Sequence, residues 1–320
     1  MRRIFLVGMG PTALSALESL LVRFEVAGLA RAAPEGLDAV LDLARGRGVP
    51  LFADLSVAAV AEAIRSAAPD CVVVSSYDRV LPAGLVAERP FVNVHYAPLP
   101  RYRGRANVNW AIINGDAATA ITIHRLAPEL DGGNILLTAE VAIGPEDGVA
   151  DLYQRLNALQ RQHLAETVGR FLDGDAGTAQ DAGGATYGCT RLPRDGAIDW
   201  TLPAPRIAAL VRALGAPYPG AFTYLEGQKL VVWKAAVPEK AARYEGRVPG
   251  RVVRVARGEG FVDVLCGDAT LRLLEVQRPG GPRLPAAELL KSVKLTLGLS
   301  TEDLLARIEE LERQLASRKG

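Results

Sequence analysis

The sequence predicts an α/β fold, with a Rossmann-like, mainly parallel sheet followed by a small OB-like β-barrel domain and a C-terminal helix. Three observations carry this prediction. Short apolar runs alternate with helical segments in the first half of the chain, which is typical of right-handed βαβ units. After residue 205 short strands are separated by Gly, Pro and charged turns, as in small barrels. From Thr301 onward apolar residues recur at helical spacing.

The 320 residues favour two domains, since domains commonly span about 100–200 residues. We expect a catalytic domain over residues 1–185, a linker over 186–204, the barrel domain over 205–300 and a helical tail over 301–320. Gly, Ala and Asp are frequent at 173–185, which is typical of a surface loop.

In the first domain, strands are predicted from apolar runs and helices from apolar stripes. The run at 71–75 is β-branched, which strongly favours a strand. Leucines at 14, 17 and 21 share one helical face. We expect strands at residues 4–7, 24–29, 71–75, 91–95, 120–126 and 135–143. We expect helices at residues 12–21, 37–44, 57–66, 106–113 and 145–171.

The second domain is predicted to hold a helix at 206–214 and then a set of short strands. These strands are expected at 222–224, 229–233, 250–255, 261–265 and 271–276. In the tail, Leu304, Ile308, Leu311 and Leu315 follow a heptad-like spacing. Such a helix would either pack on the barrel or pair with a second copy to form a homodimer. Two heptads are fewer than the ~3–4 that usually indicate a coiled coil.

Composition excludes several classes of protein. The formal net charge of +1 gives no global attraction to nucleic acid or to an anionic membrane. The three cysteines are scattered, which argues against a disulfide framework and a structural zinc site. The apolar run at 4–7 is too short for a signal peptide, and no run reaches the ~18 residues of a membrane helix. We expect a soluble cytoplasmic protein.

One of the three histidines lies beside an amide at the end of a strand. Asn93 and His95 are two residues apart on the strand 91–95, so their side chains point to the same face. Pro98 follows closely and places the pair at the carboxyl end of the strand, where open α/β sheets bind ligands. An amide can donate to a developing oxyanion, and an imidazole can exchange a proton near neutral pH. The pattern indicates a catalytic pair.

Other polar residues have two interpretations. Asn93 would also suit a turn cap. Asp131 precedes two glycines, as in a common turn, but a carboxylate there could also orient an imidazole, and spacing leaves the two interpretations even. His124 is expected to be a structural sheet residue, and His163 a residue on a solvated helix face.

Three segments together carry a family resemblance. Residues 93–95 read Asn-Val-His, residues 99–104 read Leu-Pro-Arg-Tyr-Arg-Gly, and residues 130–133 read Leu-Asp-Gly-Gly. These segments and their spacing resemble the signature of 10-formyltetrahydrofolate-dependent formyltransferases. Residues 102–115 look most like the enzymes that act on UDP-linked 4-amino-4-deoxyarabinose. Residues 217–234 are similar to the family's C-terminal barrel, which also occurs in methionyl-tRNA formyltransferases.

The resemblance implies formyl transfer from 10-formyltetrahydrofolate to a primary amine. It implies that Asn93, His95 and Asp131 form the catalytic triad, and that no metal is needed. By the same match, folate contacts are expected from the segment after the strand 71–75, from Arg105 and from the loop that ends at Asp131. These residues are Tyr77, Asp78, Arg79, Arg105, Ala127, Pro128, Glu129 and Leu130.

The acceptor amine is inferred from departures from the family pattern. Tyr96 stands where the family usually has Gly or Pro, so we expect it to reshape the cleft and to contact the acceptor. Arg212 is a second candidate contact, whereas Asp199 and Trp200 are expected to be a turn residue and a core aromatic. The tRNA enzymes carry a basic, glycine-rich insertion where residues 31–36 here are short and hardly basic. A nucleotide-linked amino sugar is therefore the expected acceptor, and a nucleic-acid partner is disfavoured.

Several alternatives stay open. An ornithine-like side-chain amine or methionyl-tRNA would be a different acceptor for the same chemistry. Residues 8–13 fit G-x-G-x-x-A after a strand, and Arg31 would suit a 2′-phosphate, so an NADP-dependent oxidoreductase is an interpretation from another class. A tight strand-to-helix turn explains the same residues. A non-catalytic folate-binding module with the same fold is a further alternative.

Overall fold

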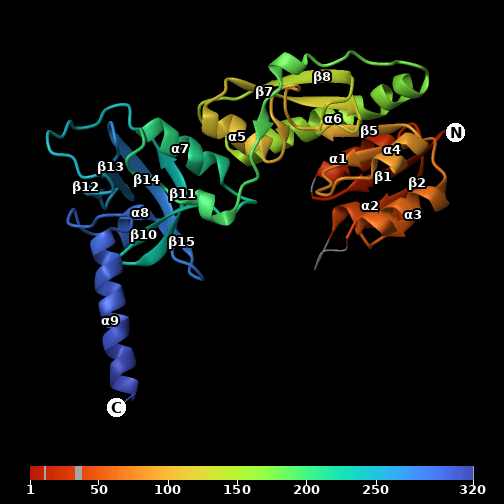
Figure 1. The fold of residues 1–320 in the computed structure, drawn as a ribbon. Coiled ribbons are helices and arrows are strands. Elements are labelled where there is room, and N and C mark those ends of the chain that lie inside the picture. Colours follow the sequence, from red (N-terminus) through yellow and green to blue (C-terminus); the bar gives the residue numbers. More distant parts are fainter. Residues whose placement is uncertain (11, 33–37, 320) are drawn as a thin grey trace. The chain divides into compact units, whose positions relative to one another are not determined.

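The computed structural model describes residues 1–10, 12–32 and 38–319. Pro11 of the Gly-x-Gly turn and the expected helix start at Leu37 lie outside the described residues. The chain forms two compact units (Figure 1). The first comprises Met1–Val108, Ala117–Gly144 and Asp151–Thr190. The second comprises Asn109–Asp116, Pro145–Ala150 and Arg191–Gly320.

The first unit is built on a seven-stranded sheet with the order β3-β2-β1-β4-β5-β7-β8. Its strands are β1 (Arg3–Gly8), β2 (Glu25–Ala30), β3 (Leu51–Phe52), β4 (Cys71–Ser75), β5 (Phe91–His95), β7 (Ala118–Arg125) and β8 (Ile135–Ala142). The strands from β3 to β5 pair in parallel, whereas β7 runs antiparallel to β5 and β8 antiparallel to β7. A two-stranded piece, β6 (Arg103–Gly104) with β9 (Tyr187–Gly188), lies apart from this sheet.

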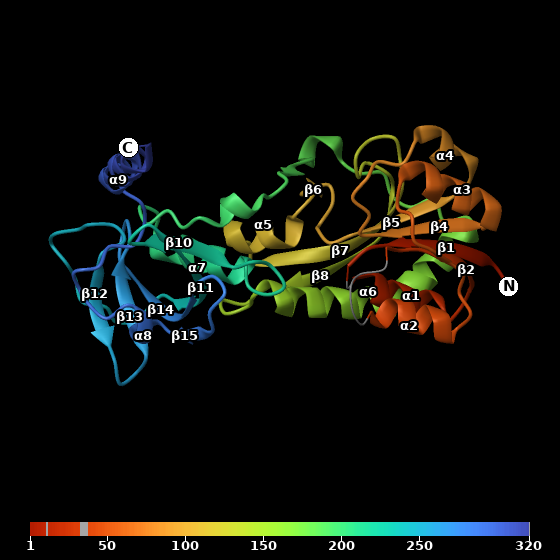
Figure 2. The ribbon, with the colours of Figure 1, turned by 90° about the horizontal axis from the view of Figure 1, so that it is seen from below.

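Helices cover both faces of this sheet, α1, α2 and α6 on one and α3 and α4 on the other (Figure 2). The helices in this part of the chain are α1 (Thr12–Leu20), α2 (Ala39–Gly46), α3 (Val57–Ala67), α4 (Ala83–Glu88), α5 (Asn107–Asn114) and α6 (Val149–Leu172). Because both faces are covered, all five residues of β4 are buried. The Ser56 hydroxyl caps α3 by accepting a hydrogen bond from the Ala59 amide. On the α3 face, Phe5, Val72 and Ile64 share one apolar core.

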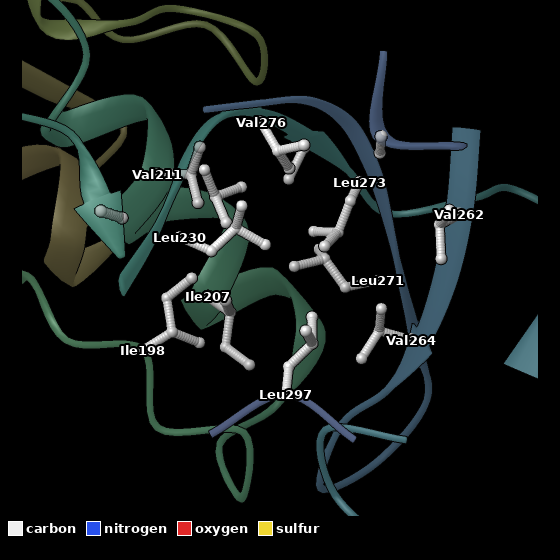
Figure 3. Packing of buried hydrophobic residues seen from close by; sticks show 14 of the residues in the cluster. Ile198, Ile207, Val211, Leu230, Val262, Val264, Leu271, Leu273, Val276 and Leu297 are labelled. Carbon is white, nitrogen blue, oxygen red and sulfur yellow. The ribbon is translucent and has the colours of Figure 1, made fainter. Parts of the chain in front are cut away.

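The second unit is an antiparallel sheet with helices packed on it. The strand order is β10-β11-β14-β13-β12, and β15 pairs with β14. The elements are α7 (Ala204–Ala213), β10 (Ala221–Leu225), β11 (Gln228–Ala236), β12 (Val252–Ala256), β13 (Phe261–Leu265), β14 (Thr270–Gln277), β15 (Arg283–Pro285), α8 (Ala286–Leu289) and α9 (Thr301–Lys319). Ile207 and Val211 of α7 point into the same interior as Leu230 and Leu273 of the strands (Figure 3).

The predicted fold class is confirmed: a mainly parallel α/β sheet, then an antiparallel domain and a C-terminal helix. Part of the segment expected to be a linker belongs to the second unit, where Ile198 and Trp200 are core residues. The side chains of α9 over residues 301–317 are exposed, so its apolar stripe does not pack on the described part of the second unit. Among the residues that the structure describes, no helix is both long and apolar enough to cross a bilayer.

Candidate active site

Asn93 is the middle residue of β5 and His95 its last, so the pair faces the carboxyl end of the strand, as the proline that follows predicts. Strand alternation gives them a common face. His95 is buried and Asn93 half-buried. The neighbouring strand β7 runs antiparallel, and its register sets Asn93 opposite His124. Residues opposite each other in an antiparallel pair point to the same face, so the sheet itself brings a second histidine to the amide.

His124 accepts a hydrogen bond from Asn93. Its Nδ1 lies 2.9 Å from the Arg125 carbonyl oxygen, to which the ring N–H donates. Its Nε2, which therefore carries a lone pair, lies 3.0 Å from Asn93 Nδ2. Burial lowers the pKa of His124 to about 4, the nearby His95 lowers it too, and Asp131 opposes both. His124 is therefore neutral at pH 7 and fixes the orientation of the Asn93 amide.

Asp131 is brought to the pair by the loop between β7 and β8. Its Oδ1 lies 3.4 Å from Asn93 Nδ2, and its Oδ2 lies 3.7 Å from His95 Nδ1. The Gly104 amide donates to Oδ2 at 2.8 Å. Asp131 has φ of +49°, a left-handed conformation that few non-glycine residues adopt. Spacing alone left the role of Asp131 undecided, whereas the structure sets its carboxylate beside both Asn93 and His95.

The His95 ring has hydrogen-bond partners for either tautomer. Its Nε2 lies 2.8 Å from the Tyr102 carbonyl oxygen and 3.0 Å from Asn107 Nδ2. When Nε2 carries the proton, it donates to the Tyr102 carbonyl oxygen. With Nε2 unprotonated, that nitrogen accepts from Asn107, and the proton on Nδ1 faces Asp131. A ring that is supported in both forms can take up a proton on one nitrogen and release it from the other.

The residues expected to contact folate fall into two groups. After β4, Tyr77 donates its hydroxyl to the Leu55 carbonyl at 2.9 Å, and exposed Asp78 lies 3.8 Å from Arg105. Burial raises the pKa of Tyr77. Arg79 is exposed beside them. The second group, Ala127, Pro128, Glu129 and Leu130, lies in the same loop as Asp131, and the Leu130 side chain is exposed.

A buried arginine supports this loop. Arg103 is 1 % exposed. It forms an ion pair with Glu129 and donates to Gln180 Oε1 at 2.9 Å. Gln180 in turn donates from Nε2 to the carbonyl oxygens of Asp131, at 2.6 Å, and Gly133, at 2.8 Å. Gln180 comes from the segment that composition indicated to be a surface loop.

Sequence reasoning missed Asn107, His124 and Gln180 as members of the site. His124 was detectable in principle, because it shares a strand face with Thr122 and an antiparallel neighbour would set that face against Asn93 and His95. No comparable signal in the sequence points to Asn107 or Gln180, because their places depend on tertiary contacts.

The two residues expected to bind the acceptor lie in different units. The Tyr96 hydroxyl contacts α6, lying 2.7 Å from Asn157 Oδ1 and 2.5 Å from Gln160 Oε1, and burial raises its pKa. Arg212, in the second unit, donates to the Asp147 carbonyl at 2.6 Å, and burial lowers its pKa. Trp200 is a core residue that donates to Thr223 Oγ1.

Arg31, the residue that suggested a 2′-phosphate site, is occupied within the fold. Its guanidinium pairs with Asp38 at 2.6 Å and donates to the carbonyl oxygens of Gly8 and Gly10. These contacts support the interpretation of this segment as a tight turn. Within the described part of the chain, no three His, Cys, Asp or Glu side chains form a group suited to a metal ion.

Two family profiles and several curated relatives match the chain. The family profile described as formyl transferase matches residues 53–168, and that of the formyl transferase C-terminal domain matches residues 192–294. The chain is 34% identical to a methionyl-tRNA formyltransferase of Geobacter sulfurreducens over 261 residues, 80% of each protein. It is 36% identical to one of Janthinobacterium sp. over 243 residues, 75% of each.

Solved structures share the fold at lower identity. HypX of Aquifex aeolicus in complex with tetrahydrofolic acid has a TM-score of 0.63 and 18% identity, over 92% of this chain and 47% of that one. A Mycobacterium tuberculosis protein, provisionally described as a sugar N-formyltransferase, has a TM-score of 0.59 and 23% identity, over 75% of this chain and 100% of that one.

The two matched domains and the curated relatives define an enzyme that transfers a formyl group to nitrogen. The chain belongs to the formyl transferase family, and the oxidoreductase alternative is set aside by that membership.

Proposed function

We propose that this enzyme transfers the formyl group of 10-formyltetrahydrofolate to the primary amine of a nucleotide-linked amino sugar. The observation that carries the proposal is the meeting of Asn93, His95 and Asp131 at the end of β5, with a neutral His124 behind the amide. An amide donor, a proton carrier and an orienting carboxylate are the groups that acyl transfer to an amine requires.

The amine nitrogen attacks the formyl carbon and forms a C–N bond, which gives a tetrahedral oxyanion and an ammonium. Asn93 donates to the oxyanion from the N–H that faces Asp131 at the long distance of 3.4 Å, while its other N–H stays on His124. His95 takes the proton from the ammonium and delivers it to N-10 of the folate as the old C–N bond breaks. Asp131 holds the imidazole in the orientation for both transfers.

The donor is proposed to bind along the two groups of residues beside the triad. Tyr77, Asp78, Arg79 and Arg105 supply polar contacts, and the loop at 127–130 supplies backbone and the exposed Leu130. The fold shared with HypX, whose structure holds tetrahydrofolic acid, supports a folate donor.

The acceptor is proposed from the resemblance of residues 102–115 to the amino-sugar enzymes and from the near-neutral charge of the chain. Tyr96 and Arg212 stay predictions as acceptor contacts. The fold shared with the protein provisionally described as a sugar N-formyltransferase supports this class of acceptor. The second candidate is methionyl-tRNA, favoured by the 34% identity to enzymes with that name.

A panel of acceptors tests the proposal. The full chain is incubated with 10-formyltetrahydrofolate and, in turn, a UDP-amino sugar, a dTDP-amino sugar, ornithine, hydroxyornithine or methionyl-tRNA, and products are measured by mass spectrometry. We expect a formylated sugar nucleotide, with the rate lowered by about 100- to 10,000-fold in His95→Ala. Formylation of methionyl-tRNA alone would replace the proposed acceptor by the second candidate. No product with any amine, together with no binding of the folate, would overturn the proposal.

A further inference from the structure

We propose that Gln180 is a positioning residue for Asp131, holding the backbone of its turn so that the carboxylate reaches His95 and Asn93. This inference rests on the proposed function, in which Asp131 orients the imidazole. The hydrogen bonds of the Gln180 side chain go to Arg103 and to two backbone carbonyls. Its side chain contacts the backbone on both sides of Gly132, with Nε2 donating to the Asp131 carbonyl at 2.6 Å and to the Gly133 carbonyl at 2.8 Å.

The Gln180 amide is itself fixed by Arg103. Both N–H groups of Gln180 are used on the turn, and its Oε1 accepts from the Arg103 guanidinium at 2.9 Å. Arg103 is 1 % exposed and is anchored by its ion pair with Glu129. An amide that is bonded at its oxygen and at both N–H groups has one orientation. The segment that carries Gln180 is therefore tied to the site through a buried charge.

The carboxylate and the backbone of Asp131 are held by one strand, β6. The Gly104 amide donates to the carboxylate at 2.8 Å, while Arg103, the residue before it, acts on the backbone through Gln180. The Arg103 amide donates to Thr186, and β6 pairs with β9, so Arg103 and Gly104 are fixed to the segment after Gln180.

The conformation of Asp131 explains why its turn needs this support. Its φ of +49° is maintained only where the surroundings impose it. The contacts that it makes to His95, at 3.7 Å, and to Asn93, at 3.4 Å, are long. A movement of ~1 Å away from them would remove both, and a misplacement of that size can cost about 100-fold in rate.

Steady-state kinetics with paired variants test the inference. In Gln180→Ala, kcat should fall about 10- to 100-fold while KM for the folate donor stays within about twofold. Gln180→Glu keeps the size of the side chain and the acceptor for Arg103 but sets a carboxylate against two carbonyl oxygens. Its kcat should therefore fall as far as that of Gln180→Ala. Gln162→Ala, at an exposed position of α6, is the matched control and should match the unmodified enzyme.

A double-mutant cycle separates positioning from a general loss of structure. If Gln180 acts through Asp131, Gln180→Ala should add less than about twofold to the loss in Asp131→Ala, because coupled residues are not additive. A multiplicative loss would overturn the inference. So would a kcat for Gln180→Ala within about twofold of the unmodified enzyme.

Histidine NMR tests the placement of Asp131 without relying on catalysis. The chain has three histidines, and Gln180→Ala should shift the ring resonances of His95 while those of His163, on α6, stay unchanged. Unmoved His95 resonances would overturn the inference even in an inactive protein. A different result is that the protein binds no folate and formylates no amine, while Gln180→Ala still shifts the His95 resonances. That result would refute the proposed function but would support the positioning of Asp131 by Gln180.

Discussion

At the scale of single residues, Asn93 depends on the neutral form of His124. A protonated His124 could not accept from the Asn93 amide, and it would place a positive charge beside the His95 ring. Burial lowers the pKa of His124 and so keeps its Nε2 free to accept the hydrogen bond from Asn93.

This low pKa predicts a pH-dependent stability. The unfolded chain protonates His124 near its ordinary pKa of 6.5, whereas the folded chain does so near 4. The free energy of unfolding should therefore fall as the pH drops from 6.5 to 4, by about 3 kcal/mol in all, and His124 should have no effect above that range. Urea unfolding of the unmodified chain and of His124→Gln across this range measures it. Equal slopes in the two proteins would show that another group is responsible.

Tyr96 supports a second prediction at this scale. Tyr96→Phe keeps the ring but removes the hydroxyl that contacts Asn157 and the fully buried Gln160. Leaving the buried Gln160 oxygen unpaired should lower the free energy of unfolding by about 1–3 kcal/mol, measured by urea unfolding at pH 7. An unchanged midpoint would mean that water takes the place of the hydroxyl. We also expect Tyr96→Ser to alter the preference among acceptor amines, and identical kinetics for all acceptors would refute that.

At the scale of elements, the loop from β7 to β8 carries most of the geometry of the site. Its two glycines differ in what a side chain would meet. A Cβ on Gly133 would lie 1.9 Å from the Arg125 carbonyl oxygen, which is backbone and cannot turn away. A Cβ on Gly132 would lie 2.6 Å from the Glu129 carboxylate, which can turn by leaving Arg103, and 2.9 Å from the Glu129 Cβ, which has to shift by less than the Arg125 backbone would.

These glycines give a matched pair of variants. Gly133→Ala should displace the loop, lower the free energy of unfolding by about 1–3 kcal/mol and reduce kcat at least tenfold, since Asp131 lies in the same loop. Gly132→Ala should have the smaller effect on both quantities. Thermal unfolding and steady-state kinetics decide the order, and equal losses in the two variants would contradict a steric clash with the Arg125 backbone as the cause.

Most elements could be predicted from the sequence because their own residues specify them. The apolar runs of β1, β4 and β5 and the stripe of α1 are local patterns, and the predicted positions of all four are confirmed within two residues. The strands β3, β6 and β9 have two residues each, too few to show a period, and α4 contains a glycine that weakens its helical pattern. Within the site, Asn93 and His95 share one strand, whereas Asp131, His124 and Gln180 reach them only through sheet pairing and loop contacts.

At the scale of the whole molecule, charge balance predicts a weak salt dependence. Lys and Arg number 37 and Asp and Glu 36. For a nucleotide-linked sugar, KM should rise about tenfold or less between 50 and 200 mM KCl, whereas an acceptor held by 6–10 phosphate contacts would lose about 10³–10⁵ in affinity. Initial rates over this salt range measure the slope. A steep slope would indicate a nucleic-acid acceptor.

The chain passes back and forth between the two units several times. Residues 109–116, which include most of α5, and residues 145–150, which end in the first turn of α6, belong to the second unit, although residues on either side belong to the first. They are bonded there: Asn109 donates to Ala213, Arg206 to Ile113 and Arg212 to Asp147. A chimaera made by joining two homologous genes at one point near residue 190 would therefore carry mismatched pieces of the second unit. Exchanging the second unit between relatives therefore requires replacing three separate segments of the chain. We expect the two units to be inherited together, because a single recombination event cannot separate them.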